Sequence, residues 1–375
     1  MSLRITALLW LIAAAVWPAS AARAQDLVIG IAAPITGNLA HIGAQLVEAA
    51  QLAVDETNAR GGIGGRRVVV RVEDDQADPK VATTAARKLA VDERVVAVLG
   101  HYSTAASLAA MPIYTKARLA AITPTAASAD LTKRGGKYLF RMLSPSSVFA
   151  RNLARYAVQT LGKKAIAVIH GQSDWGVSAK DAFVKELEKV GAKAAVLQPV
   201  NEADADFRGR LKKVKAANPD AVAILTYYTT GALVTLQARS VEITAPLIGT
   251  GALHEDKFIE LAGPGNAEGV TVNTEFSSDD PTPVVRDFVA AYQKAHPDQK
   301  PDAYHALAYD AMRVILGAIA RAGADRDAVR DAIAATTSFV GVTGTFAFND
   351  QRERDATDQP YVVVKDGMWT FVGHH

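Results

Sequence analysis

The chain has 375 residues, and its 41 Lys and Arg nearly balance its 39 Asp and Glu. Such a balance argues against a nucleic-acid partner, which would call for a basic excess or a basic stripe. The sequence contains no cysteine, which excludes disulfides, thiolate metal sites and a lipid-modified N-terminal cysteine.

Residues 1–24 are predicted to be a cleaved secretory signal peptide, with a buried N-terminal helix as the alternative. Arg4 provides a positive start, residues 6–17 an apolar block, and Ala22-Arg23-Ala24 a small-x-small cleavage site. The apolar block is shorter than the roughly 20 residues that span a bilayer. Cleavage before Gln25 leaves a formally neutral chain long enough for two domains, which we expect to be soluble in the periplasm.

Apolar runs of strand length then alternate with helical patterns, as is typical of parallel sheets with crossover helices. A helix from about Ile42 has apolar residues along one face, and Gly61 and Gly62 mark its end. The first series of strands is expected at 27–33, 68–72, 95–99 and 119–123.

A second series starts near residue 145, so the pattern occurs twice. Because these strands are apolar on both faces, each series should form a sheet covered on both sides. Strands are expected at 165–169, 194–197, 221–225, 247–248 and 270–272, helices at about 284–296, 303–322 and 325–335, and a hairpin at 361–364 and 368–372. Two such lobes leave a cleft, where the carboxyl ends of the strands bind ligands.

Signatures of enzymes are weak. The glycine run 61–65 follows a helix and precedes a strand, the reverse of a phosphate-binding loop. Ser173 opens a helix after a strand, but a nucleophile elbow needs glycine where Trp175 stands. We therefore predict no catalytic residue, no metal site and no cofactor.

Polar residues at the strand ends have plainer interpretations. His101 lies in the expected cleft without an apparent partner carboxylate, which favours a hydrogen-bonding residue over a base. Asp74 and Asp75 close a strand, and we expect them to cap the next helix rather than to bind a metal.

Two neighbouring segments, VLGHYSTAAS at 98–107 and ITPTAAS at 122–128, each leave a buried strand and end in small hydroxyl residues. These hydroxyls can simply cap helices. A helix N-terminus in a cleft, however, also offers backbone N–H groups and a positive dipole end to a carboxylate. Two such turns side by side predict a small anion cradle.

These two segments, together with AAPITG at 32–37, NARGGIGG at 58–65, EDDQADP at 73–79 and AYDA at 308–311, resemble the leucine/isoleucine/valine-binding proteins of bacterial ABC importers. The resemblance runs from about Leu27 to the end of the chain. It implies the α/β type I periplasmic-binding-protein fold, with two doubly wound parallel-sheet lobes, a ligand cleft between them and a chain that crosses three times. We place lobe one at 26–143 and 275–345, and lobe two at 144–274 and 346–375.

The resemblance also implies a ligand site. The family's carboxylate-binding serine matches Thr104, the residue that offers a carbonyl to the ligand ammonium matches Thr125, and wall aromatics match Trp175, Tyr227 and Tyr304. The predicted ligand-binding residues are Tyr102, Ser103, Thr104, Thr125, Ala127, Ser128, Trp175, Tyr227, Gly251, Glu275 and Tyr304.

Departures from the family pattern bear on the ligand. A carboxylate-binding threonine is replaced by Ala127, which keeps only its backbone N–H unless Ser128 turns inward, and a tyrosine is replaced by Ile42. The disulfide of some members is missing, with Ala77 and Ser103 at its positions. The glutamate that neutralises the ligand ammonium is replaced by Gly251.

Because an unpaired buried ammonium costs several kcal/mol, the loss of this glutamate favours a carboxylate without an α-amino group. Aromatic, branched aliphatic and keto acids are the expected ligands. Glu275 or Asp174 would restore the charge in the alternative, a true leucine/isoleucine/valine-binding or other amino-acid-binding protein.

We therefore expect a monomeric, non-enzymatic periplasmic receptor that delivers a small carboxylate to an inner-membrane ABC permease after its lobes close on the ligand. The alternatives from other classes are an enzyme on the same lobes and the ligand-sensing module of a receptor.

Overall fold

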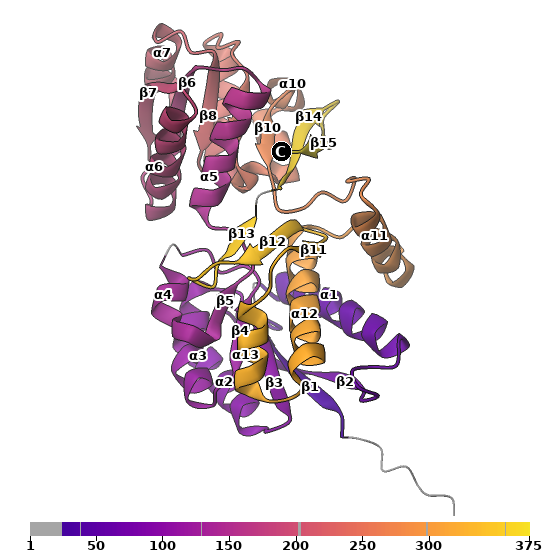
Figure 1. The fold of residues 1–375 in the computed structure, drawn as a ribbon. Helices are drawn as coiled ribbons and strands as arrows, with labels where there is room; N and C mark the ends of the chain where they lie inside the picture. Colours follow the sequence, from indigo (N-terminus) through magenta and orange to yellow (C-terminus); the bar gives the residue numbers. More distant parts are fainter. Residues whose placement is uncertain (1–24, 38, 129, 202–203, 298, 357) are drawn as a thin grey trace, which may run out of the picture.

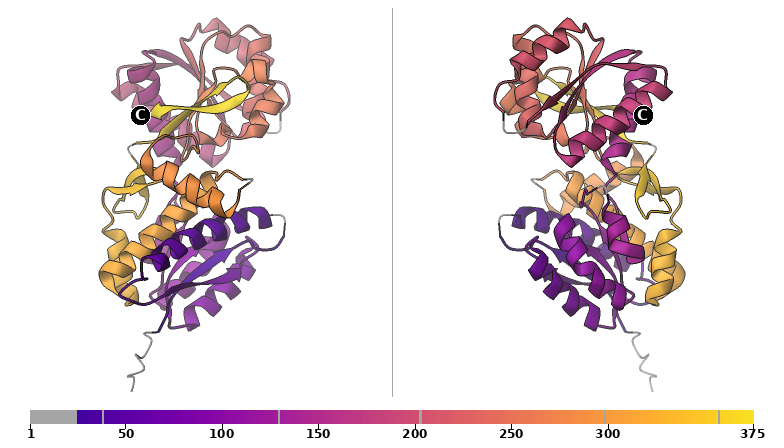
Figure 2. Two further views of the ribbon diagram at one scale, coloured as in Figure 1. Left: turned by 90° about the vertical axis from the view of Figure 1, so that its right-hand side faces the viewer. Right: turned by 90° about the vertical axis from the view of Figure 1, so that its left-hand side faces the viewer.

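The computed structural model describes residues 25–375 except 38, 129, 202–203, 298 and 357. Two α/β lobes lie at opposite ends of an elongated molecule and are joined by three chain crossings (Figures 1 and 2). The predicted signal peptide, residues 1–24, falls outside the described residues. None of the helices that the structure describes is both long and apolar enough to cross a membrane.

Lobe one contains a five-stranded sheet in which every neighbouring pair is parallel. Runs of Val and Ile favour extended backbone in these strands because branched side chains pack well on a pleated surface. In their order across the sheet the strands are β2 (Val68–Asp74), β1 (Leu27–Ala33), β3 (Val95–Gly100), β4 (Ala120–Thr123) and β5 (Leu139–Arg141).

Helices cover both faces of this sheet. One core gathers residues of α1, α11, α12 and α13, and the other gathers residues of α2, α3 and α4. Their bounds are α1 (Ala40–Ala59), α2 (Pro79–Val91), α3 (Thr104–Lys116), α4 (Leu131–Gly135) with the 3₁₀ turn η1 (Gly136–Tyr138), α11 (Pro283–Ala295), α12 (Ala303–Ala322) and α13 (Arg326–Ala334).

The cap of α2 corrects one prediction. Asp78, rather than Asp74 or Asp75, accepts hydrogen bonds from the N–H groups of Lys80 and Val81, and Pro79 occupies the first turn. Proline suits that position because the first helical N–H groups have no partner inside the helix. Asp74 instead accepts a hydrogen bond from the Ile35 N–H at 2.9 Å, and Asp75 accepts one from the Ala77 N–H at 2.8 Å.

Lobe two contains a seven-stranded sheet. Its first five strands along the chain are parallel to one another, the sixth runs antiparallel to them, and the seventh runs antiparallel to the sixth. Across the sheet the order is β15 (Met368–His374), β14 (Pro360–Lys365), β10 (Thr271–Asn273), β9 (Leu247–Gly249), β8 (Ala221–Leu225), β6 (Ala165–Gly171) and β7 (Lys193–Val200). One face is covered by α5 (Ser146–Arg155), the π-helical turn η2 (Tyr156–Thr160) and α6 (Asp174–Lys189). The other is covered by α7 (Arg208–Ala216), α8 (Tyr228–Ser240), α9 (Asp256–Ala262) and α10 (Pro264–Ala267), and η3 (Gly251–Leu253) follows β9.

A small antiparallel sheet precedes the third crossing. It consists of β11 (Phe339–Gly341), β12 (Gly344–Phe348) and β13 (Arg354–Ala356). Phe346, Phe348 and Ala356 are buried in a core of lobe one. The chain therefore returns to lobe two after Ala356, and not at residue 346 as the sequence division expects.

Candidate ligand-binding site

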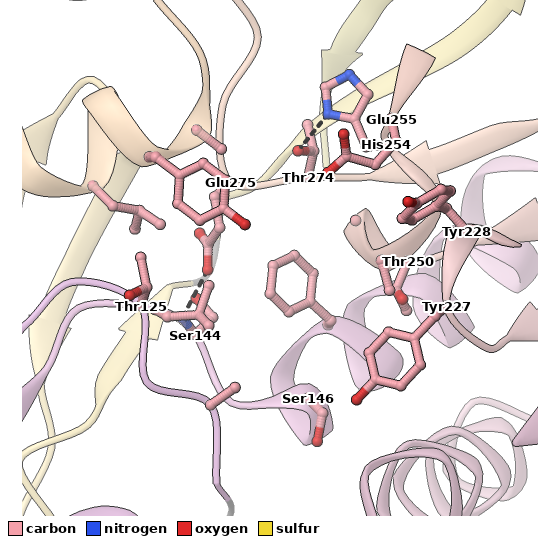
Figure 3. Close-up of a pocket in the computed structure, with 18 of the residues that line it drawn as sticks. Thr125, Ser144, Ser146, Tyr227, Tyr228, Thr250, His254, Glu255, Thr274 and Glu275 are labelled. Carbon is pink, nitrogen blue, oxygen red and sulfur yellow. Dashed lines mark hydrogen bonds between the residues drawn. The ribbon is translucent and has the colours of Figure 1, made fainter. Parts of the chain in front are cut away.

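A cavity of about 380 Å³ lies between the lobes and is lined from both (Figure 3). Lobe one contributes Tyr102, Thr125, Ala127, Ala303, Tyr304 and Leu307. The segments near the first two crossings contribute Leu143, Ser144, Thr274 and Glu275, and lobe two contributes Ser146, Phe149, Trp175, Tyr227, Tyr228, Thr250, Gly251, Ala252, His254 and Glu255. This volume suits a small molecule, since ligand pockets span about 300–1,000 Å³.

Most of the predicted ligand-binding residues line this cavity, namely Tyr102, Thr125, Ala127, Trp175, Tyr227, Gly251, Glu275 and Tyr304. Ser103, Thr104 and Ser128 do not. The Ser103 hydroxyl accepts a hydrogen bond from the Ala106 N–H at 3.2 Å and so caps α3. The Ser128 hydroxyl donates to Asp130 at 2.8 Å, and its backbone N–H donates to the Thr104 hydroxyl at 3.3 Å.

The small hydroxyl residues after β3 and β4 bind the two turns to each other. Thr123 Oγ1 donates to the His101 carbonyl oxygen at 2.6 Å, and Thr125 Oγ1 donates to that of Tyr102 at 2.8 Å. The Ala127 N–H, which is the group that the family pattern leaves for an anion, has no acceptor among the described residues. The Ala127 N–H is therefore a backbone donor that these turns offer to a carboxylate, whereas the N–H groups of Ala126 and Ser128 are already used.

Glycine is needed where β3 enters its turn. Gly100 has a φ of +140°, and a Cβ added there would lie 2.3 Å from the carbonyl oxygen of Ala32 on the neighbouring strand. A side chain at position 100 would therefore displace β1 or β3 and move the turn that follows.

His101 has a carboxylate partner, so the prediction that it lacks one is wrong. Its Nδ1 lies 2.6 Å from Asp75 Oδ2, and its Nε2 lies 3.1 Å from the Tyr114 hydroxyl. All three side chains are buried, and none lines the cavity. The cluster fixes the end of β3 against β2 and α3, which is a structural role.

Two aromatic pairs form walls of the cavity on opposite lobes. Trp175 and Tyr227 stack on lobe two, with ring centroids 5.2 Å apart and planes at 22°. Tyr102 and Tyr304 meet on lobe one at a centroid distance of 6.3 Å and a tilt of 54°. Such rings supply large apolar surface together with polar hydroxyl tips.

Position 251 carries no side chain, and the nearest predicted substitute is already engaged. The Glu275 carboxylate accepts a hydrogen bond from the Ser144 N–H at 2.7 Å and forms a buried ion pair with Arg354. The other predicted substitute, the side chain of Asp174, falls outside the described part of the structure.

His254 and Glu255 line the cavity and were missed by the sequence analysis. His254 Nδ1 lies 2.9 Å from the Thr274 hydroxyl, and burial lowers the pKa of His254 to about 4, so the ring is neutral at neutral pH. Desolvation by the cleft walls raises the pKa of Glu255, and the charges of Asp302 and Asp256 add to that effect. Their position in the sequence could have indicated them, because they follow β9 by a few residues and so lie at the same carboxyl edge of the sheet as the other site residues.

The structure brings no three His, Asp or Glu side chains together as a metal site within its described residues. The cavity instead offers backbone donors, aromatic walls and carboxylates.

Two α/β lobes, three crossings and a cavity lined from both sides define a two-lobed solute-binding protein. The chain belongs to the periplasmic binding protein family, whose sequence profile matches residues 26–366. Within it the chain falls among the leucine/isoleucine/valine-binding proteins of branched-chain amino acid ABC transporters, which bind solutes and are not enzymes.

Several known relatives support this placement. The Leu/Ile/Val-binding protein homolog 3 of Brucella melitensis is 31% identical over 84% of both chains. A crystal structure from Rhodospirillum rubrum, assigned to branched-chain amino acid ABC transport, is 34% identical, has a TM-score of 0.86 and covers 92% of this chain and all of that one. The substrate-binding protein LivJ of Streptococcus pneumoniae, solved with isoleucine, is 27% identical with a TM-score of 0.73, and the match covers 93% of this chain and 99% of that one.

Proposed function

We propose that this chain is a solute receptor that closes its two lobes on a small carboxylate with an apolar or aromatic side chain. The observation that carries the proposal is the cavity between the lobes, with backbone donors on one lobe and an aromatic pair on each. A ligand that touches both lobes favours the closed state by its differential affinity for it.

The head group of the ligand decides between two candidates. The Gly251 position, with Glu275 already paired, favours a carboxylate without an α-amino group. The relatives named as Leu/Ile/Val-binding proteins support an α-amino acid more strongly. We therefore favour the amino acid and keep the aromatic or keto acid as the second candidate.

The proposed partner is an inner-membrane ABC permease, and the proposed location is the periplasm, reached by cleavage before Gln25. We propose that the receptor acts as a monomer, because one chain forms both walls of the cavity. N-terminal sequencing of periplasmic extract tests the cleavage, and sedimentation tests the oligomeric state. A retained apolar segment or a stable dimer would contradict the corresponding proposal.

The ligand class is tested by releasing the co-purified ligand from denatured protein and identifying it by mass spectrometry. Calorimetric titration of the stripped protein follows, with leucine, phenylalanine, their 2-oxo acids and benzoate. We expect at least one of these carboxylates to bind with one-to-one stoichiometry. Failure of all of them, or chemical turnover of a bound one, would overturn the proposal.

A further inference from the structure

Two acidic side chains of the described residues line the cavity, and one of them has no partner among those residues. Glu275 is held by Arg354 and by the Ser144 N–H. The Glu255 carboxylate makes no hydrogen bond or ion pair within the described part of the chain. Of the two, only Glu255 is therefore available to a positively charged group on a ligand.

Among the described residues, no neighbouring cation neutralises Glu255. Lys257, two residues further along, donates to Glu260 at 2.5 Å, and His254 is neutral at neutral pH because burial lowers its pKa. Asp302, at the start of α12 on lobe one, is close enough to raise the pKa of Glu255. Asp302 is itself hydrogen-bonded to His305 and Gln45 and does not line the cavity, so Glu255 is the carboxylate that a positively charged group of a ligand would meet there.

The backbone of Glu255 is fixed even though its side chain is accessible. Trp369 Nε1 donates to the Glu255 carbonyl oxygen at 3.2 Å, and the Glu255 N–H donates to the Leu253 carbonyl oxygen at 2.8 Å. The carboxylate thus projects from an anchored turn, which lowers the entropy lost when it binds a ligand.

Glu255 and the backbone donors after β4 belong to opposite lobes. Figure 3 shows Thr125 and Glu255 on different sides of the cavity. A ligand with a carboxylate at the Ala127 N–H and an ammonium at Glu255 would connect the lobes through both of its charges. Closure would then depend on both charged groups of the ligand.

We infer that Glu255 supplies the counter-charge that Gly251 lacks, and that it selects α-amino acids over the corresponding deaminated acids. This inference rests on the proposed function, because it assigns the head group of the ligand in the same cavity. It makes Glu255 a specificity-determining residue.

The test compares Glu255→Gln with Glu188→Gln, which removes the same charge from an exposed position on α6 outside the cavity and leaves the Lys257–Glu260 pair intact. Both variants and the unaltered protein are titrated calorimetrically with leucine and phenylalanine, each beside its 2-oxo acid. We expect Glu255→Gln to weaken binding of the amino acids at least tenfold and to leave the 2-oxo acids unchanged or tighter. Glu188→Gln should leave the affinities for both ligand classes unchanged.

A rescue variant separates charge from structure. A Cβ at Gly251 would lie 3.3 Å from the Asn273 carbonyl oxygen and 3.5 Å from the Thr274 Cα, so a Cβ fits there after a small adjustment of the neighbouring backbone. Gly251→Glu combined with Glu255→Gln should restore at least part of the amino-acid affinity, because the carboxylate returns to the same wall.

The outcomes distinguish this inference from the proposed function. Binding of 2-oxo acids but not amino acids by the unaltered protein would leave the receptor proposal standing and overturn the role of Glu255. Equal losses for both ligand classes in Glu255→Gln, or no loss at all, would also overturn it. If no amino acid or 2-oxo acid bound, the proposed function would fall and the inference with it.

Discussion

Glu275 and Arg354 form a buried ion pair that joins two of the three segments linking the lobes. Glu275 follows β10, where the chain leaves lobe two, and Arg354 lies on β13, just before the chain returns. Glu275 also accepts the Ser144 N–H at 2.7 Å, and Arg354 Nη1 donates to the Ser144 hydroxyl at 3.2 Å, which ties in the first crossing. One carboxylate therefore connects all three crossings beside the cavity.

Removal of the Arg354 charge should destabilise the protein strongly. In Arg354→Met the buried Glu275 carboxylate loses its counter-charge, and we expect a loss of about 3–5 kcal/mol in the free energy of unfolding. Urea denaturation at neutral pH measures it. Arg151→Met is the control, because the Arg151–Asp355 pair at 3.3 Å is partly exposed and should contribute less than about 1 kcal/mol. Equal losses in the two variants would show that the Glu275–Arg354 pair contributes no more to the free energy of unfolding than a partly exposed pair does.

The hydroxyl of Thr123 should matter for stability although it does not line the cavity. Thr123 is fully buried, donates to the His101 carbonyl oxygen at 2.6 Å and accepts from the Ala126 N–H at 3.1 Å. Thr123→Val keeps the shape, leaves the Ala126 N–H without its acceptor and leaves the His101 carbonyl oxygen with only the Ser107 hydroxyl at 3.4 Å, so we expect a loss of about 1–3 kcal/mol. Thermal unfolding measures the stability of this variant, and Thr84→Val, at an exposed position of α2, is the control. A change in Thr123→Val no larger than in that control would mean that the two turns hold together without this hydroxyl.

Trp175 should contribute to ligand binding more than to folding. Its ring stacks on Tyr227 and lines the cavity, so Trp175→Ala removes a wall of the proposed site. We expect ligand affinity to fall at least tenfold, equal to about 1.4 kcal/mol. Val177→Ala, at an exposed position of the same helix outside the cavity, should bind normally. Calorimetric titration with the co-purified ligand measures both variants, and unchanged affinity in Trp175→Ala would place the ligand elsewhere.

Acidification should weaken the fold through His254. Burial lowers the pKa of His254 from its ordinary 6.5 to about 4. Between these values the unfolded chain binds a proton that the folded chain does not, so stability present above pH 6.5 is lost as the pH falls toward 4. The expected loss is on the order of 2 kcal/mol.

His254→Gln should reduce that pH dependence when urea unfolding is compared at pH 7 and pH 4.5. His41→Gln, at an exposed position of α1, should keep it. Parallel pH profiles for the protein and His254→Gln would exclude His254 as the cause.

The regular elements follow from the sequence because their signals are local. Apolar runs at 27–33 and 221–225 coincide with β1 and β8, and the periodic segment 303–322 coincides with α12. The strands that the sequence missed, β5 and β11 to β13, are three to five residues long, too short for a periodicity to emerge. The predicted end of lobe one at residue 345 also differs from the structure. Phe346 and Phe348 on β12 are buried in a core of lobe one, and these long-range contacts leave no local pattern in the sequence.

The sequence by itself determined two α/β lobes and the family resemblance, and most of the ligand-binding residues predicted from it line the cavity, since strand ends of parallel sheets converge at one edge. Only the tertiary structure decided which charges are available. Glu275 is paired because Arg354, distant in the chain, reaches it, whereas Glu255 has no partner in the described part of the chain and the nearby Lys257 pairs with Glu260. The two side chains are chemically identical glutamates, and the chemistry of each depends on which charges, donors and solvent surround it in space.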